Sequence, residues 1–105
     1  MIRLHALGTV SLVKPDGQPL DAVLAQPKRF ALLFYLATAG AGHHRRDTLF
    51  DLFWREADQA GARASLNQAV YFLRRALGRD AILSRGNEEV AVDSTLLWSD
   101  VAAFE

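Results

Sequence analysis

The stretch "RASLNQAVYFLRRALG", residues 63–78, has the pattern of an amphipathic helix with two unlike faces. Apolar side chains recur every three or four positions and so share one side of a helix with 3.6 residues per turn; they are Leu66, Val70, Leu73 and Leu77. The other side carries amide, aromatic and guanidinium groups where a solvated helix would carry Glu and Lys; these are Gln68, Tyr71, Phe72 and Arg75, with Asn67 and Arg74 on a flank. This second face has the chemistry of a binding surface.

A second, shorter helix precedes this one. The stretch "HHRRDTLFDLFW", residues 43–54, predicts a helix over 46–53 whose inward face is made by Leu49, Leu52 and Phe53. Trp54, which follows it, is interpreted as a core or boundary aromatic. Asp58 is suited to cap the N-terminus of the long helix, and Gly78 to end it.

The segment after the long helix predicts a β-hairpin. "AILSRGNEEVAVD", residues 81–93, contains two alternating runs, Ile82–Arg85 and Glu89–Asp93, around Gly86-Asn87. A short helix, a tight turn and a longer helix with a polar outer face make a helix-turn-helix, and a hairpin directly after it is a wing. Glu88 and Glu89 would repel DNA, so only part of this wing can face a duplex.

The N-terminal part predicts two strands and a buried helix. We expect strands over Ile2–Leu7 and Thr9–Val13, a turn at "KPDGQP" (14–19), and a short strand with a loop at "PLDAVLA" (19–25). Pro27 suits the first turn of a helix that runs apolar nearly all round and is ended by Gly40 and Gly42. The expected fold class is α+β: a winged helix-turn-helix with a small N-terminal antiparallel sheet, three helices and a C-terminal β-hairpin wing.

Composition narrows the functional classes. The chain of 105 residues is long enough for one domain with one core, and it has no cysteine. No apolar run is long enough to span a bilayer and no secretory leader is recognisable, so a cytoplasmic protein without membrane contact is expected. The net charge is zero but segregated: residues 63–86 hold five arginines against one aspartate, whereas residues 87–105 hold five acidic residues and no basic one. A basic surface is therefore compatible with the neutral total.

The candidate site residues lie on the long helix and around it. Gln can pair bidentately with adenine and Arg with guanine in a major groove, and aromatic edges can meet thymine methyl groups. The base-contacting candidates are Asn67, Gln68, Tyr71 and Arg75. The candidates for the DNA backbone are Arg45, Arg46, Arg63, Arg74, Arg79 and Arg85. The alternative is a surface helix whose Tyr71 and Phe72 pack on the hairpin or the sheet, with solvated arginines; Arg85 and the 43–46 cluster have the same alternative.

Other chemistry is disfavoured. His43 and His44 are adjacent and diverge, His5 is distant in sequence, and there is no cysteine, so no metal site is expected. The chain has no Walker loop and no signature of a hydrolase, a dinucleotide-binding enzyme or a metalloprotease. We expect no enzyme and no cofactor. Lys28 and Arg29 are expected to be exposed to solvent.

Several motifs together resemble a known family. They are "QPKR-x-ALL" (26–33), "HRRDTL" (44–49), "LFW" (52–54) and "AR-x-SL-x-QA-x-Y-x-LRRALG" (62–78). The chain resembles the N-terminal DNA-binding domain of the Streptomyces antibiotic regulatory protein (SARP) family, bacterial transcriptional activators with an OmpR/PhoB-type winged helix followed by a bacterial transcriptional activation domain. It departs from the family at Asn67 and Phe72, where many relatives carry a basic residue, and at Arg55, where Pro is frequent.

The resemblance implies a domain organisation and a function. It implies a winged-helix domain over 1–98 and, over 99–105, the start of a following helical activation domain, with Ser99 or Asp100 as N-cap of a helix beginning at Val101. It implies sequence-specific binding of double-stranded DNA by a transcriptional activator, with RNA polymerase contact and weak self-association on DNA as compatible partners. The alternative is a winged-helix module for protein contacts, in dimerisation or in docking to RNA polymerase.

Overall fold

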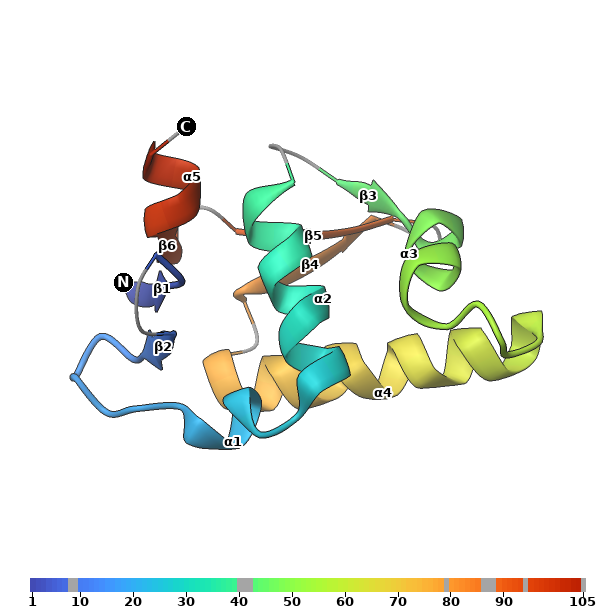
Figure 1. Ribbon diagram of the computed structural model, residues 1–105, viewed down its shortest axis with the longest axis horizontal. Coiled ribbons are helices and arrows are strands. Elements are labelled where there is room, and N and C mark those ends of the chain that lie inside the picture. Colours follow the sequence, from blue (N-terminus) through green and yellow to red (C-terminus); the bar gives the residue numbers. More distant parts are fainter. Residues whose placement is uncertain (8–9, 40–42, 79, 86–88, 94, 105) are drawn as a thin grey trace.

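The computed structural model describes residues 1–7, 10–39, 43–78, 80–85, 89–93 and 95–104. They form an α+β arrangement in which a long helix, α4, runs along one side and α2 stands across it (Figure 1). In chain order the elements are β1 (Ile2–His5), β2 (Ser11–Val13), α1 (Asp21–Leu24), α2 (Pro27–Thr38), β3 (His44–Arg45), α3 (Arg46–Phe53), α4 (Gln59–Leu77), β4 (Ile82–Arg85), β5 (Glu89–Val92), β6 (Leu97–Ser99) and α5 (Asp100–Phe104).

The long helix forms as its sequence predicts. Asp58 precedes the first turn of α4, and its Oδ1 accepts a hydrogen bond from the N–H of Gly61 at 2.7 Å. Gly78 follows the last turn with a φ of 109°, a conformation that side chains with a Cβ rarely adopt. The apolar stripe is buried and is extended by two small residues; its members are Ala62, Leu66, Ala69, Val70, Leu73 and Leu77. Burial of this stripe against α2, α3 and β4 places the polar face of α4 outward.

The short helix has the predicted bounds but a different inward face. Leu49 is fully buried and Phe53 half-buried, as expected, whereas Leu52 is 50% exposed. The expectation for Leu52 was wrong. The buried side of the helix carries Leu49, Phe53 and also Phe50, which is buried. Leu52 lies about 100° around the helix from Phe53, in the direction away from Phe50, and so points outward. Trp54 is buried, as predicted.

The predicted hairpin is present as β4 and β5, paired antiparallel from Ile82↔Val92 to Arg85↔Glu89. The turn at Gly86-Asn87 lies outside the described residues. A third strand, β3, was not predicted from the sequence. It pairs antiparallel with β5 and makes a three-stranded sheet in the order β3-β5-β4. Two residues are too few for a periodic signal, so only the tertiary pairing identifies this strand.

The N-terminal sheet is not purely antiparallel. β1 pairs antiparallel with β2, as expected, but its other edge pairs in parallel with β6, a strand that the sequence did not predict. The two observed N-terminal strands are shorter than predicted, and residues 8 and 9 lie outside the described part. The segment after Pro19 forms the one-turn helix α1 rather than a strand and loop, because Val23 is fully buried there.

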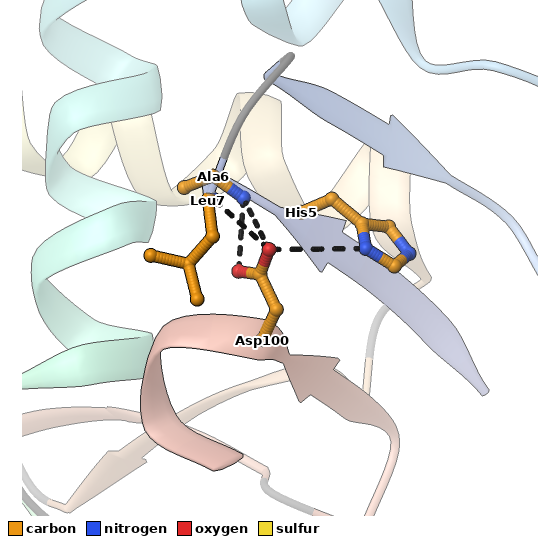
Figure 2. A network of polar contacts seen from close by, with 4 residues as sticks. All are labelled: His5, Ala6, Leu7 and Asp100. Atoms are coloured by element: carbon orange, nitrogen blue, oxygen red, sulfur yellow. Dashed lines mark hydrogen bonds and ion pairs between the residues drawn. The ribbon is translucent and has the colours of Figure 1, made fainter. Parts of the chain in front are cut away.

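The end of the chain returns to its beginning. The Asp100 carboxylate accepts hydrogen bonds from the N–H groups of Ala6 and Leu7 at 2.9–3.0 Å, with the Nδ1 atom of His5 at 3.9 Å (Figure 2). The helix begins at Asp100, and Ser99 is a buried strand residue whose hydroxyl has no partner among the described residues, so the expected Ser99 cap is not formed. β6 therefore crosses the 98/99 position at which a domain boundary was expected.

The helix α2 starts at Pro27 as predicted and ends at Thr38, with Ala39 as its C-cap; Gly40 and Gly42 lie outside the described residues. Its buried residues, Leu32, Leu33 and Leu36, face the core. Among the described residues, no helix combines the length and the apolar character that crossing a bilayer requires.

Candidate nucleic-acid interface

The outer face of α4 is a continuous polar and aromatic surface. The four side chains predicted to contact bases, Asn67, Gln68, Tyr71 and Arg75, are all exposed on it, and Tyr71 is 62% exposed. They line one shallow depression together with Phe72 and Ala76 of the same helix and Arg29 of α2. The helix thus brings the predicted base-contacting residues together, as the 3.6-residue period requires.

Tyr71 and Arg75 are held to each other. One turn apart on α4, they are joined by a hydrogen bond from Arg75 Nη1 to the Tyr71 hydroxyl at 3.1 Å. The guanidinium carbon also lies 5.8 Å from the centre of the Tyr71 ring. This contact limits the rotamers of a long side chain, so the Arg75 guanidinium is partly ordered before any partner arrives.

Asn67 is engaged by the neighbouring helix. Its Oδ1 atom accepts a hydrogen bond from Nη1 of Arg46, the first residue of α3, at 3.0 Å. The amide NH₂ of Asn67 keeps its donors for a ligand, but its carbonyl oxygen is already used. Gln68, in contrast, has no hydrogen-bond partner among the described residues, so both halves of its amide are available.

Three arginines gather where α3, α4 and the β4–β5 hairpin meet. Arg46 lies near Arg63 and Arg74, which come from α4 on the same flank of the helix. Partial burial, together with the positive charges of Arg63 and Arg74, lowers the pKa of the Arg46 guanidinium from its usual value. The buried Nε of Arg46 has no acceptor among the described residues. An anion bound beside these guanidiniums would relieve their mutual repulsion.

The Arg74 side chain also links α4 to the strand β4. Its Nε donates to the carbonyl oxygen of Ile82 at 3.1 Å, and its Nη2 donates to the hydroxyl of Ser84 at 2.9 Å. Both acceptors lie on β4. The half-buried Arg74 side chain thus connects α4 to the β4–β5 hairpin.

The remaining backbone-contact candidates lie around the sheet β3-β5-β4. Arg45 is exposed and lies 3.5 Å from an Asp47 carboxylate oxygen. In the strand register, Glu89 of β5 stands between Arg45 of β3 and Arg85 of β4, so an acidic position separates two basic ones. Arg79 lies outside the described residues.

Arg29, which was not among the predicted site residues, also belongs to this surface. Lys28 is exposed, as expected, and its Nζ lies 3.3 Å from Glu56 Oε1. Arg29 is only half-exposed, because its guanidinium carbon lies 4.8 Å from the centre of the Phe72 ring. Phe72 itself, predicted to point away from the apolar stripe, is half-buried against the core. Arg29 and Phe72 are far apart in the chain, so no local pattern could have paired them.

The His44 side chain packs against an aromatic ring of α2. His44 contacts the ring of Tyr35 edge-on at 5.2 Å. Within the part of the chain that the structure describes, no three His, Cys, Asp or Glu side chains are grouped to hold a metal ion. Comparisons of the chain with protein-family models, with curated proteins and with solved structures gave no match.

Proposed function

We propose that this chain binds double-stranded DNA sequence-specifically, as a winged helix-turn-helix domain of a bacterial transcriptional activator. The observation that carries the proposal is the grouping of Arg46, Arg63 and Arg74 along one edge of the exposed polar face of α4. Guanidiniums are suited to phosphate oxygens, and an adjacent row of amide and guanidinium groups is suited to base edges.

In this proposal α3 and α4 form the helix-turn-helix and β4–β5 forms the wing. α4 enters the major groove, which is about 12 Å wide and admits one helix. Gln68 and Arg75 meet base edges, while Arg46 and Arg63 bind phosphates and set the register. Asn67 orients Arg46 and presents its NH₂ group to the groove.

A salt titration tests the proposal. Binding of the 105-residue chain to a fluorescein-labelled duplex of random sequence is measured by anisotropy at several salt concentrations. We expect weak binding that falls with salt, with a slope of about −0.9 in log K against log salt for every phosphate contact. A selection from random duplexes then identifies the preferred sequence. Affinity that is independent of salt, or a selection that enriches no sequence, would contradict the proposal.

A module for protein contacts is the second candidate, and one observation favours it. The outer surface between α2 and α3 has an apolar depression lined by Phe30, Phe34, Leu52 and Phe53, among others. Leu52 is half-exposed there although it is a large apolar side chain. If this were the main function, Leu52→Ser would remove partner binding, and Arg46→Ala would leave it unchanged.

A further inference from the structure

Arg29 lies on the edge of the outer face of α4 opposite to the edge that carries Arg46. Asn67, which Arg46 contacts, and Phe72, which Arg29 covers, are five residues apart and so about 140° apart around the helix. Gln68, between them around the helix, lies on the floor of the depression that Arg29 also lines. The face predicted to read bases is therefore bordered by a guanidinium on each side.

The two bordering arginines come from different helices. In Figure 1 the Pro27 end of α2 reaches α4, whereas α3 packs on the other part of α4. The first turn of α2 contains no acidic residue. Arg29 has no carboxylate partner among the described residues, unlike its neighbour Lys28, which pairs with Glu56.

Stacking on Phe72 fixes Arg29 without using its donors. A guanidinium over an aromatic ring is attracted through its flat face, and its N–H groups point outward in its own plane. Those donors remain available for a planar or tetrahedral anion, and the ordering cost of the long side chain is already met in part by the stacking. An arginine held in this way is suited to a fixed phosphate position.

We propose that Arg29 binds a phosphate of the DNA strand opposite to the strand bound by Arg46, so that the two arginines hold α4 in the major groove from both sides. The proposal rests on the DNA binding proposed above. A helix lying in the major groove has one phosphate backbone on each side, and contacts to both fix its position across the groove. Phe72 acts as a positioning residue for Arg29.

The test uses the 105-residue chain with three substitutions. Arg29→Gln removes the charge and keeps much of the side-chain stem over Phe72, whereas Arg29→Lys keeps the charge. Arg3→Ala is the matched control, because Arg3 also stacks on an aromatic ring, 5.7 Å from the centre of Trp98, but lies on β1 in the N-terminal sheet. Circular dichroism melts of each variant establish the temperature at which all of them are folded.

The expected result is a loss that does not depend on sequence. Arg29→Gln should weaken binding to a selected duplex and to a random duplex by the same factor, roughly eightfold at 0.1 M salt, and should reduce the salt slope by about 0.9, the value of one phosphate contact. Arg29→Lys should keep the wild-type slope with a weaker affinity, since an ammonium stacks less well on the ring. Arg3→Ala should match the wild-type chain in both respects.

The outcomes separate the two proposals. If the wild-type chain binds duplex DNA and Arg29→Gln behaves like Arg3→Ala, Arg29 is not a phosphate contact and the proposed function still stands. A loss confined to the selected duplex would also overturn the phosphate assignment. If the wild-type chain binds neither duplex, both proposals fall. Should Arg29→Gln prove unfolded at every usable temperature, Arg29→Met takes its place as an uncharged variant with a long stem, and a wild-type affinity and salt slope in that variant overturn the inference.

Discussion

Replacing Arg74 with alanine should destabilise the domain by separating α4 from the hairpin. Arg74 lies on the flank of α4 beside the apolar stripe and makes two hydrogen bonds to β4, from Nε to the Ile82 carbonyl and from Nη2 to the Ser84 hydroxyl. The first bond is partly buried and the second is exposed. In the alanine variant the Ile82 carbonyl loses this donor, and the methylene groups of the side chain no longer cover the junction.

The magnitude follows from these two bonds. Hydrogen bonds to a charged group stabilise a protein by about 1.5–3 kcal/mol each when they are well shielded, and exposed ones by much less. With one bond partly buried and one exposed, we expect Arg74→Ala to lower the free energy of unfolding by about 1–2 kcal/mol. In a domain of this size about 1 kcal/mol shifts the melting temperature by roughly 4–8 °C, so a fall of about 4–16 °C is expected.

The assay is thermal unfolding followed by circular dichroism, with Arg75→Ala as the matched control. Arg75 is the next residue on the same helix and carries the same charge, but it is exposed, and its hydrogen bond among the described residues goes to Tyr71 of its own helix. Its removal should change stability by less than about 0.5 kcal/mol. Ser84→Ala removes one of the two acceptors and should give part of the Arg74 effect. Equal melting temperatures for Arg74→Ala and Arg75→Ala would refute the assignment of Arg74 as a link between α4 and the hairpin.

Two further substitutions probe the recognition face and the closing contact of the chain. Arg75→Ala is expected to change the sequence preference in a random-duplex selection without a large change in affinity for random DNA; an unchanged preference would place Arg75 outside the base-reading set. Partial burial raises the pKa of the Asp100 carboxyl. The hydrogen bonds from the N–H groups of Ala6 and Leu7 lower this pKa by more, so it lies below its usual value. The Asp100 carboxylate therefore stabilises the fold above the ordinary Asp pKa, and this stabilisation is lost as the pH falls through the lower pKa of the folded state. In melting temperatures recorded from about pH 6 to about pH 2, Asp100→Asn should make the fall at acidic pH less steep. Asp51→Asn, on an exposed position of α3, should leave that fall unchanged.

Local patterns in the sequence predicted the helices and the hairpin well. α3 has the predicted bounds, and α4 begins after Asp58 and ends before Gly78, because capping chemistry and the apolar period act over a few residues. The strands β4 and β5 likewise pair with each other, close in the sequence. Each of these elements is determined by residues within or beside it, so each can be predicted without the rest of the chain.

The elements that were missed depend on distant partners. β3 is strand-like only because β5 lies beside it, and β6 only because β1 does, nearly the whole chain away. Similarly, α1 is a single turn that depends on the burial of Val23. A period of 2 or 3.6 cannot develop in two to four residues, so tertiary contacts decide these segments.

In the candidate site, too, the features that depend on local sequence were predictable and those that depend on distant partners were not. The helical period alone brought Asn67, Gln68, Tyr71 and Arg75 to one face, and the structure agrees. What each side chain contacts was not predictable, since Arg46 reaches Asn67 from α3 and Arg74 reaches back to β4. A helical wheel gives the direction of a side chain from its own axis but gives no partner on a neighbouring element.

Asn67 shows how a neutral amide can hold a positive charge at the edge of α4. The Asn67 side chain carries no charge of its own. Its carbonyl oxygen, however, draws the Arg46 guanidinium to 3.0 Å, so α3 supplies a cation at the same edge of the helix. A basic residue at position 67 would instead stand against Arg46, whose pKa is already lowered by partial burial and by Arg63 and Arg74. The neutral amide and the guanidinium are therefore matched, and α3 supplies the positive charge at this edge of α4.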